Sequence, residues 1–330
     1  MLWGFLTLVL AGCLPKEERQ KVAAKAETDY VSARDLSDIR VGYCSPTMNG
    51  PFYGALEQAV RSTATAYGMQ YLSTDGQGDI TRQVMAVEDL LSRGIQILIL
   101  NPLDPQALVP AVHLARSQGV EVFILDSTID EGTPYTAALF ADNQLNGELL
   151  GLWLAEQNIA EPQIAIISGN QGNPVGREKR LGFVRGLADG QLHRNAKTSF
   201  DVVAHGWGGW NNNGGLAAME DILVAHPYVN VLLAENDAMA LGAMKVIQQM
   251  DKTDQITVLG FDGQKEAYEM IKAGRFAATA QNSPKILGET MVELVVKYLN
   301  GEEVNKVNHT PSVLITSQNV KQFHDPNALF

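Results

Sequence analysis

The sequence predicts an α/β protein made of two doubly wound parallel-sheet lobes. Short aliphatic runs alternate with amphipathic helical segments through both halves of the chain, and polar segments follow the runs. With 330 residues, of which 45% are hydrophobic and 19% charged, the chain is long enough for two domains. No Gly/Ser-rich linker separates the halves, so we expect direct strand connections between the lobes.

The predicted strands of the first half are aliphatic or β-branched runs, typical of parallel strands that are buried on both faces. They occupy 39–44, 70–73, 95–100 and 120–125. Between them, apolar residues recur at helical spacing, first at Phe52, Leu56, Ala59, Val60 and Thr63, and then at Ile80, Val84, Val87 and Leu91. Gly94 is expected to end the second of these helices.

The second half repeats the pattern, with strands predicted at 164–168, 229–234 and 256–261 and an amphipathic helix around Val184. Polar loops follow the strands of both halves, at 45–51, 101–105, 126–127, 170–175, 235–237 and 262–264. Open α/β sheets bind ligands at the carboxyl ends of their strands. Two facing sets of such loops therefore predict a ligand cleft.

The first thirteen residues form an apolar stretch that is shorter than the roughly 20 residues needed to span a bilayer. This length predicts an export signal. The motif LAGC at 10–13 resembles the bacterial lipobox, which implies lipidation at Cys13. We therefore expect an exported protein, in the periplasm or on the outer cell surface, anchored to the membrane through Cys13. An ordinary signal with a chance cysteine is the alternative.

Segment 14–37 is rich in Lys, Glu, Gln and Ala, which predicts a solvated tether. The chain has two cysteines, so lipidation of one leaves no pair for a disulfide, and Cys44 is expected to be a buried strand residue. The formal net charge of −12 argues against nucleic acid as a partner. The six histidines share no metal-ligand spacing, so we expect neither a metal nor a cofactor.

Several motifs together resemble the periplasmic ribose-binding protein family in order and spacing, from about residue 39 to residue 316. They are NGPFY at 49–53, NP at 101–102, LD at 125–126, REKRLGF at 177–183, AHP at 225–227, ENDAMALG at 235–242 and GFDG at 260–263. The resemblance implies a type I periplasmic binding protein fold with a three-crossover hinge. The crossovers are expected near 141–143, 281–283 and 310–313.

These crossovers divide the expected domains. The N-terminal lobe would comprise 38–142 and 283–310, and the C-terminal lobe 143–282 and 311–330. The resemblance implies a monomeric solute-binding protein that captures a monosaccharide or a related polyol and delivers it to the permease of an ABC transporter. A sensor subunit that presents the liganded form to a chemoreceptor or a histidine kinase is the alternative.

When the motifs of the family are matched to this sequence, the resemblance implies an aromatic clamp formed by Phe52, Tyr53 and Trp210. Flat aromatic rings cover the apolar faces of a sugar, while polar groups bind its hydroxyl rim. The residues expected to bind this rim are Asp126, Arg177, Asn236, Asp262 and Asn282, with Asn49, Ser127 and Trp207 as further candidates.

Two positions depart from the family. Gly50 stands where the family commonly has a second asparagine, and Ser127 stands where ribose binders usually have an arginine. The segment WGGWN at 207–211 is also more aromatic than usual. The ligand is therefore expected to be monosaccharide-like without being ribose in particular.

Structural roles are the alternative for each candidate. Phe52, Tyr53 and Trp210 could be packing residues, Asp126 and Asp262 could cap helices, Arg177 could form a surface ion pair, and Asn49 could serve a turn.

An enzyme and a sugar-responsive repressor are two other functions for a chain of this fold class. No nucleophile elbow, Walker-type phosphate loop or zinc-protease helix is present, and an arginine in the cleft would work against the raised carboxyl pKa that glycoside hydrolysis needs. A repressor would need an N-terminal DNA-binding helix-turn-helix, where this chain has an export signal. Neither function is expected.

Overall fold

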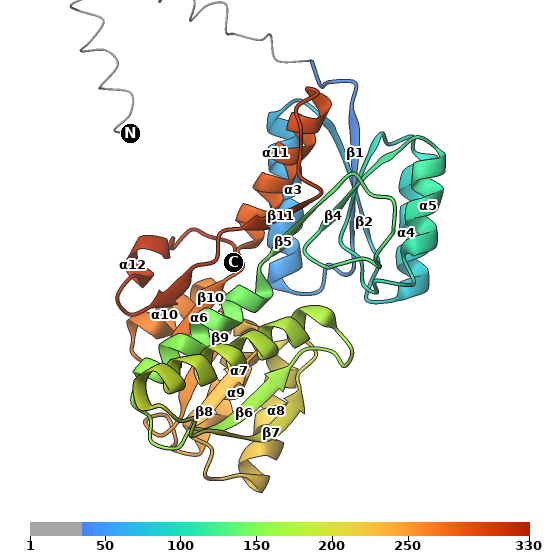
Figure 1. Cartoon of the computed structure of the whole chain (residues 1–330). Coiled ribbons are helices and arrows are strands. Elements are labelled where there is room, and N and C mark those ends of the chain that lie inside the picture. Colours follow the sequence, from blue (N-terminus) through green and yellow to red (C-terminus); the bar gives the residue numbers. More distant parts are fainter. Residues whose placement is uncertain (1–34) are drawn as a thin grey trace, which may run out of the picture. The chain divides into compact units, whose positions relative to one another are not determined.

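The structure, a computed structural model, describes residues 35–330. The predicted signal, the lipidation site Cys13 and most of the predicted tether lie outside the described residues. Two six-stranded sheets with flanking helices make up the described chain, which confirms the predicted fold class (Figure 1). We call each sheet with its covering helices a lobe.

The N-lobe sheet is entirely parallel, with the strand order β11-β5-β4-β3-β1-β2. Its strands are β1 (Arg40–Ser45), β2 (Gln70–Asp75), β3 (Ile97–Leu100), β4 (Glu121–Leu125), β5 (Ala137–Ala141) and β11 (Val307–Thr310). The helices α3 (Pro51–Ala66), α4 (Ile80–Ser92), α5 (Val109–Ser117) and α11 (Pro284–Leu299) cover it.

The C-lobe sheet has the order β12-β10-β9-β8-β6-β7 and is parallel except for β12, which runs antiparallel to β10. Its strands are β6 (Gln163–Ser168), β7 (Asp201–Trp207), β8 (Val231–Ala234), β9 (Thr257–Asp262), β10 (Ala278–Gln281) and β12 (Leu314–Thr316). The helices are α6 (Asn143–Glu156), α7 (Pro174–Asn195), α8 (Asn212–Ala225), α9 (Asp237–Gln249), α10 (Lys265–Lys272) and α12 (Val320–Phe323).

The central strands are apolar on both faces, as the sequence predicts. All four residues of β3, with the sequence ILIL, are buried, and so are the four of β8, with the sequence VLLA. Helices on both faces of each sheet exclude water from these side chains. Cys44 on β1 is fully buried with a free thiol, which confirms the predicted buried strand residue, and burial raises its pKa to about 12.

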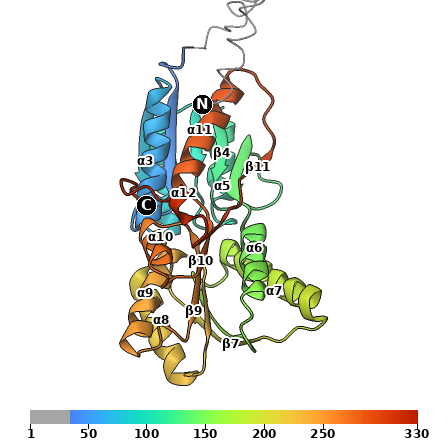
Figure 2. The ribbon, with the colours of Figure 1, turned by 90° about the vertical axis from the view of Figure 1, so that its left-hand side faces the viewer.

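The chain passes between the two sheets three times. It leaves β5 at Ala141 for α6, leaves β10 at Gln281 for α11, and runs from β11 to β12 across 311–313. These are the three predicted crossovers. Helix α11 returns to pack against α3, so segments far apart in the sequence lie side by side in the N-lobe (Figure 2).

Helices α6 and α7 pack through glycines. A Cβ atom on Gly147 would lie 2.2 Å from the backbone oxygen of Lys179, and one on Gly182 would lie 2.1 Å from that of Gln144. Only residues without a side chain allow the two backbones to approach this closely. Because α6 begins directly at a crossover, this contact joins the hinge firmly to the C-lobe.

Among residues 35–330, no helix is both long and apolar enough to cross a membrane.

Candidate functional site

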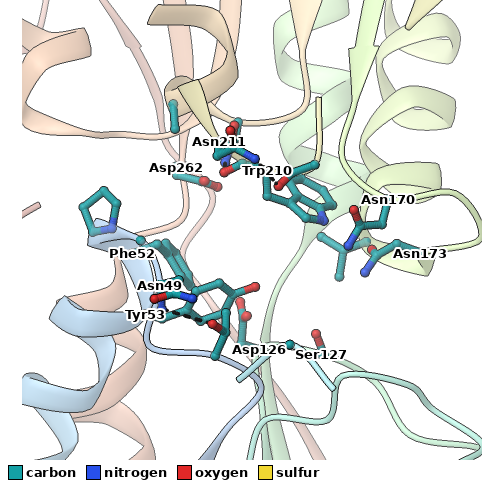
Figure 3. A pocket seen from close by; sticks show the side chains of 18 of the residues that line it. Asn49, Phe52, Tyr53, Asp126, Ser127, Asn170, Asn173, Trp210, Asn211 and Asp262 are labelled. Atoms are coloured by element: carbon teal, nitrogen blue, oxygen red, sulfur yellow. Dashed lines mark hydrogen bonds between the residues drawn. The ribbon is translucent and has the colours of Figure 1, made fainter. Parts of the chain in front are cut away.

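A cavity of about 690 Å³ is lined by the loops at the carboxyl ends of strands from both sheets. In Figure 3, residues of the N-lobe face residues of the C-lobe across this cavity. Nine of the predicted site residues line it: Asn49, Phe52, Tyr53, Asp126, Ser127, Trp210, Asn236, Asp262 and Asn282.

Arg177 and Trp207 do not line the cavity. Arg177 points to solvent from the first turn of α7, and Lys179, two residues later, lines the cavity instead. A residue two positions along a helix lies on a different face. Matching the local sequence to the family motif therefore selected Arg177, whereas Lys179 is the cation that lines the cavity. Trp207 is 44% exposed at the end of β7, where its ring lies 4.6 Å from that of His205.

Two carboxylates and one ammonium group meet in the cavity. Lys179 Nζ donates to Asp262 Oδ1 at 3.1 Å and to the carbonyl oxygen of Glu235 at 2.9 Å. Asp126 Oδ2 accepts from Asn101 Nδ2 at 3.1 Å. Asp126 belongs to the N-lobe and Asp262 to the C-lobe. The oxygens of both carboxylates retain lone pairs that can accept from further donors.

Burial shifts the titration of both carboxyls. It raises the pKa of Asp126 to about 6, and the nearby charge of Asp262 adds to the shift, while Asn101 and Lys179 oppose it. Burial likewise raises the pKa of Asp262, although the Lys179 ammonium counteracts this. Neither aspartate is an N-cap: Gln264 caps α10, and the chain continues from Asp126 into β5. The alternative prediction, that Asp126 and Asp262 cap helices, is therefore wrong.

The aromatic side chains lie on opposite walls of the cavity (Figure 3). Phe52 and Tyr53, in the first turn of α3, pack edge to face with ring centroids 5.6 Å apart. Trp210 approaches from the loop after β7, and Lys179 Nζ lies 5.6 Å from the centroid of its ring. Rings on opposite walls can cover both apolar faces of a flat ligand.

Gly169 allows Trp210 to lie where it does. A Cβ atom on Gly169 would lie 1.8 Å from the indole ring, so the ring rests directly on backbone. Asn236 Nδ2 donates to the carbonyl oxygen of Trp210 at 3.2 Å, while Asn236 Oδ1 accepts from Met239 N at the start of α9. Asn236 thus both caps a helix and fixes the tryptophan loop.

The buried Glu235 side chain holds the end of β6, against which the indole ring of Trp210 rests. It accepts from Gly169 N at 2.9 Å and from Ser168 Oγ at 2.7 Å, and it pairs with Arg180. Ser168 Oγ also contacts His205 Nε2 at 2.7 Å. Because Ser168 is fully buried and bonded to an arginine and a carboxylate as well, this group holds a loop and does not present a nucleophile.

Four non-glycine residues that line the cavity have left-handed backbone conformations, which such residues rarely adopt. The φ angle is 53° at Gln77, 66° at Asp126, 63° at Trp210 and 102° at Asp262. Such conformations persist where the surrounding structure imposes them, and they cluster at functional loops. All four residues stand at or shortly after the carboxyl end of a strand.

Among the described residues, five buried amides have a side-chain oxygen without a hydrogen-bond partner, and two of these five line the cavity. The two are Asn282 Oδ1 and Gln264 Oε1, on side chains that are 4% and 7% exposed. Both oxygens are themselves buried, so a ligand hydroxyl would reach them only if the amide side chains turned toward the cavity.

Several lining residues were not predicted individually: Lys179, Asn170, Asn173, Asn211, Asn212, Asn213, Gln264 and Phe330. Asn170, Asn173 and Gln264 belong to the polar loops that the sequence places after strands. Asn173 and Asn211 also cap helices α7 and α8, so their side-chain oxygens already accept backbone bonds. No group of three or more His, Cys, Asp or Glu side chains suited to a metal ion occurs within 35–330.

The comparisons with known proteins agree with this geometry. A family described as a periplasmic binding protein domain matches residues 41–303. The ribose import binding protein of Bacillus subtilis (strain 168) is 32% identical over 281 residues, which cover 85% of this chain and 88% of that protein.

Two solved structures are also similar. An ABC transporter solute-binding protein from Mycobacterium smegmatis, solved with bound glycerol, is 30% identical, with a TM-score of 0.80 over 88% of this chain and 98% of that one. The Caulobacter myo-inositol binding protein, bound to myo-inositol, is 25% identical, with a TM-score of 0.79 over 88% and 97% of the two chains.

Proposed function

Because the chain belongs to the periplasmic binding protein family, whose members bind solutes and are not enzymes, we propose that its cleft captures a monosaccharide or a related polyol. The two carboxylates between aromatic walls carry this proposal. Asp126 and Asp262 line one cavity together with the aromatic residues Phe52, Tyr53 and Trp210, and the amides of Asn282 and Gln264 line it as well. A ring with apolar faces and a rim of hydroxyl donors matches both features.

The charge of the site narrows the ligand class. Lys179 is the one cationic side chain among the described residues that line the cavity, and its ammonium is bonded to Asp262. Asp126 then leaves the cavity with a net negative charge when it is ionised. An anionic sugar would meet an unpaired carboxylate at close range, which is unfavourable in a partly desolvated site. The proposed ligand class therefore leaves out anionic sugars.

The export of family members supports a location outside the cytoplasm, where an ABC permease would receive the liganded form. We further propose the lipid anchor at Cys13, which rests on the LAGC motif alone. Changing Cys13→Ser should release the protein from the membrane fraction without altering its ligand affinity. Wild-type protein that carries an unmodified Cys13 thiol would contradict the anchor.

A thermal-shift screen tests the ligand class. D-ribose, D-allose, myo-inositol and glycerol form the neutral set, and D-ribonate is the matched anionic probe. A ligand that binds only the folded state stabilises it by about 2.7 kcal/mol at a concentration of 100 Kd, which gives a measurable rise in Tm. We expect at least one neutral probe to raise Tm and D-ribonate to leave it unchanged. A response to D-ribonate alone, or repeated turnover of any probe, would contradict the proposal.

A further inference from the structure

The segment after α12 connects the two lobes at one side of the cleft. We call residues 324–330 the strap. On its C-lobe side, Val320 and Phe323 of α12 pack against the hydrophobic core, and Lys265 Nζ donates to the carbonyl oxygen of Ala328 at 3.0 Å. In Figures 1 and 2 the C end of the chain lies between the two lobes.

The sequence of the strap favours this course. Asp325 and Pro326 stand at the first and second positions of a turn, where both residue types are preferred. Ala328 N donates to the carbonyl oxygen of Asp325 at 3.1 Å, and Asn327 N donates to Asp325 Oδ1 at 2.8 Å. The turn directs the following residues toward the N-lobe.

Phe330 makes the contact with the N-lobe. Its ring centroid lies 5.6 Å from that of Phe52, at an interplanar angle of 85°. Phe52 contacts Tyr53 with the same edge-to-face geometry. The three rings form a row in which Phe330 fixes the orientation of the aromatic residue that opens α3.

Phe330 also separates two cavities. The ligand cavity lies on one side, and a second cavity of about 500 Å³, lined by α3, α10, α11 and the rest of the strap, lies on the other. Among the described residues 35–330, Phe330 is the one that lines both. Removing its ring would join the two cavities.

We infer that Phe330 is a specificity-determining residue of the ligand site: it closes the cavity on the side of the strap and fixes the ring of Phe52. This inference rests on the proposed function, because the ligand is taken to lie against Phe52. An apolar ring at this wall limits the length of the ligand and offers no partner to a further hydroxyl group.

Isothermal titration of Phe330→Ala tests the inference, with Leu329→Ala as the matched control because Leu329 is 64% exposed in the same segment. The probe is whichever of D-ribose, D-allose, myo-inositol and glycerol binds the wild type most tightly. We expect Phe330→Ala to weaken its binding about tenfold, Phe330→Leu to have a smaller effect, and Leu329→Ala to stay within twofold. Equal affinities of wild type and Phe330→Ala would overturn the inference and leave the proposed function standing.

A measurement without ligand keeps the two proposals separable. In urea unfolding of the free protein, Phe52→Leu and Phe330→Leu should together destabilise the protein by less than the sum of the single changes, because each removes the same ring contact. Strictly additive effects would show that Phe330 does not act on Phe52 and would overturn the inference. Failure of every probe to bind wild-type protein would instead contradict the sugar-binding function.

Discussion

Lys179 Nζ lies 3.1 Å from Asp262 Oδ1, and the lysine side chain is only 2% exposed. The amine comes from α7 and the carboxylate from the end of β9, so the ion pair joins two elements at the floor of the cleft. Helix α7 reaches this position because its glycines allow it to pack closely on α6. The Lys179 ammonium, which balances the charge of the Asp262 carboxylate, is therefore already in place without a bound ligand.

Loss of Lys179 should weaken ligand binding strongly. Lys179→Met keeps an unbranched chain but leaves the buried Asp262 carboxylate without its cation, at a cost of about 1–3 kcal/mol or more. Affinity for the best neutral probe should fall at least about tenfold by isothermal titration. Arg177→Ala is the control: its side chain is exposed outside the cavity, so affinity should stay within twofold. The opposite order of effects would place Arg177 in the site.

Trp210 and Trp207 provide a matched pair for the stacking role. Trp210 lines the cavity, whereas Trp207 lies outside it and is 44% exposed. Trp210→Ala should weaken binding about tenfold or more, because a large apolar surface facing the ligand is lost. Trp207→Ala should change affinity little. Equal losses in the two variants would show that the stacking surface extends beyond the cavity described above.

Ligand affinity should rise with pH between about 5 and 7. The pKa of Asp126, about 6, lies in this window because burial and the facing Asp262 raise it, against the opposing effects of Asn101 and Lys179. Only the ionised carboxylate accepts freely from two neighbouring hydroxyls. Titrations with the best neutral probe should show this rise in wild type and a flatter profile in Asp126→Asn. An identical profile in both proteins would exclude Asp126 as the cause.

The stability of the ligand-free protein should have the opposite slope. Since the pKa of Asp126 in the folded chain exceeds its ordinary value of 3.8, the folded state binds more protons than the unfolded state between about pH 4 and 6. The contribution of this carboxyl to the free energy of unfolding therefore falls as pH rises through the window. Asp262, whose pKa is also raised, acts in the same direction. Asp126→Asn should reduce the slope in urea titrations.

The packing of α6 on α7 should make Gly182 intolerant of any side chain. A Cβ atom there would lie 2.1 Å from the backbone oxygen of Gln144, so the helices must separate, at a cost of about 1–3 kcal/mol. Gly54→Ala in α3 is the control, since no atom lies within 4 Å of the added methyl group. It should stabilise the protein by about 0.5–1 kcal/mol. Urea unfolding measures both, and an unchanged stability in Gly182→Ala would disprove the tight contact.

The central strands of each sheet could be predicted from the sequence, but most of the outer strands could not. Runs such as ILIL in β3 are apolar because both of their faces are covered. Strand β7 lies at an edge, is partly exposed and pairs with β6 through an irregular register, so its sequence DVVAHGW has no clear pattern. Strands β10 and β11, with the sequences ATAQ and VNHT, lack the continuous apolar run that marks β3, and β12 has only three residues.

The structure places predicted site residues around the cavity where a motif follows a strand, and it places Arg177 outside the cavity, where helical geometry decides. Asp126 and Asp262 follow buried strands, so their place at the carboxyl ends of the sheets could be predicted. The choice between Arg177 and Lys179 depends on the rotation of α7, which the sequence of one helix does not determine. Phe330 joins the site through a turn that brings it back from the C-lobe, and no local pattern marks that contact.

The pairing of β11 with β5 also bears on how the protein is made. Asn308 donates to the carbonyl oxygen of Ala138 across a sequence separation of 170 residues. During synthesis, helix α11 and the last strand of the N-lobe, β11, can therefore join this lobe only after almost the whole chain has been made. Such long-range pairing slows folding and leaves apolar surface uncovered in the nascent polypeptide. The topology thus leaves the N-lobe incomplete for most of translation, a state that is compatible with the export proposed above.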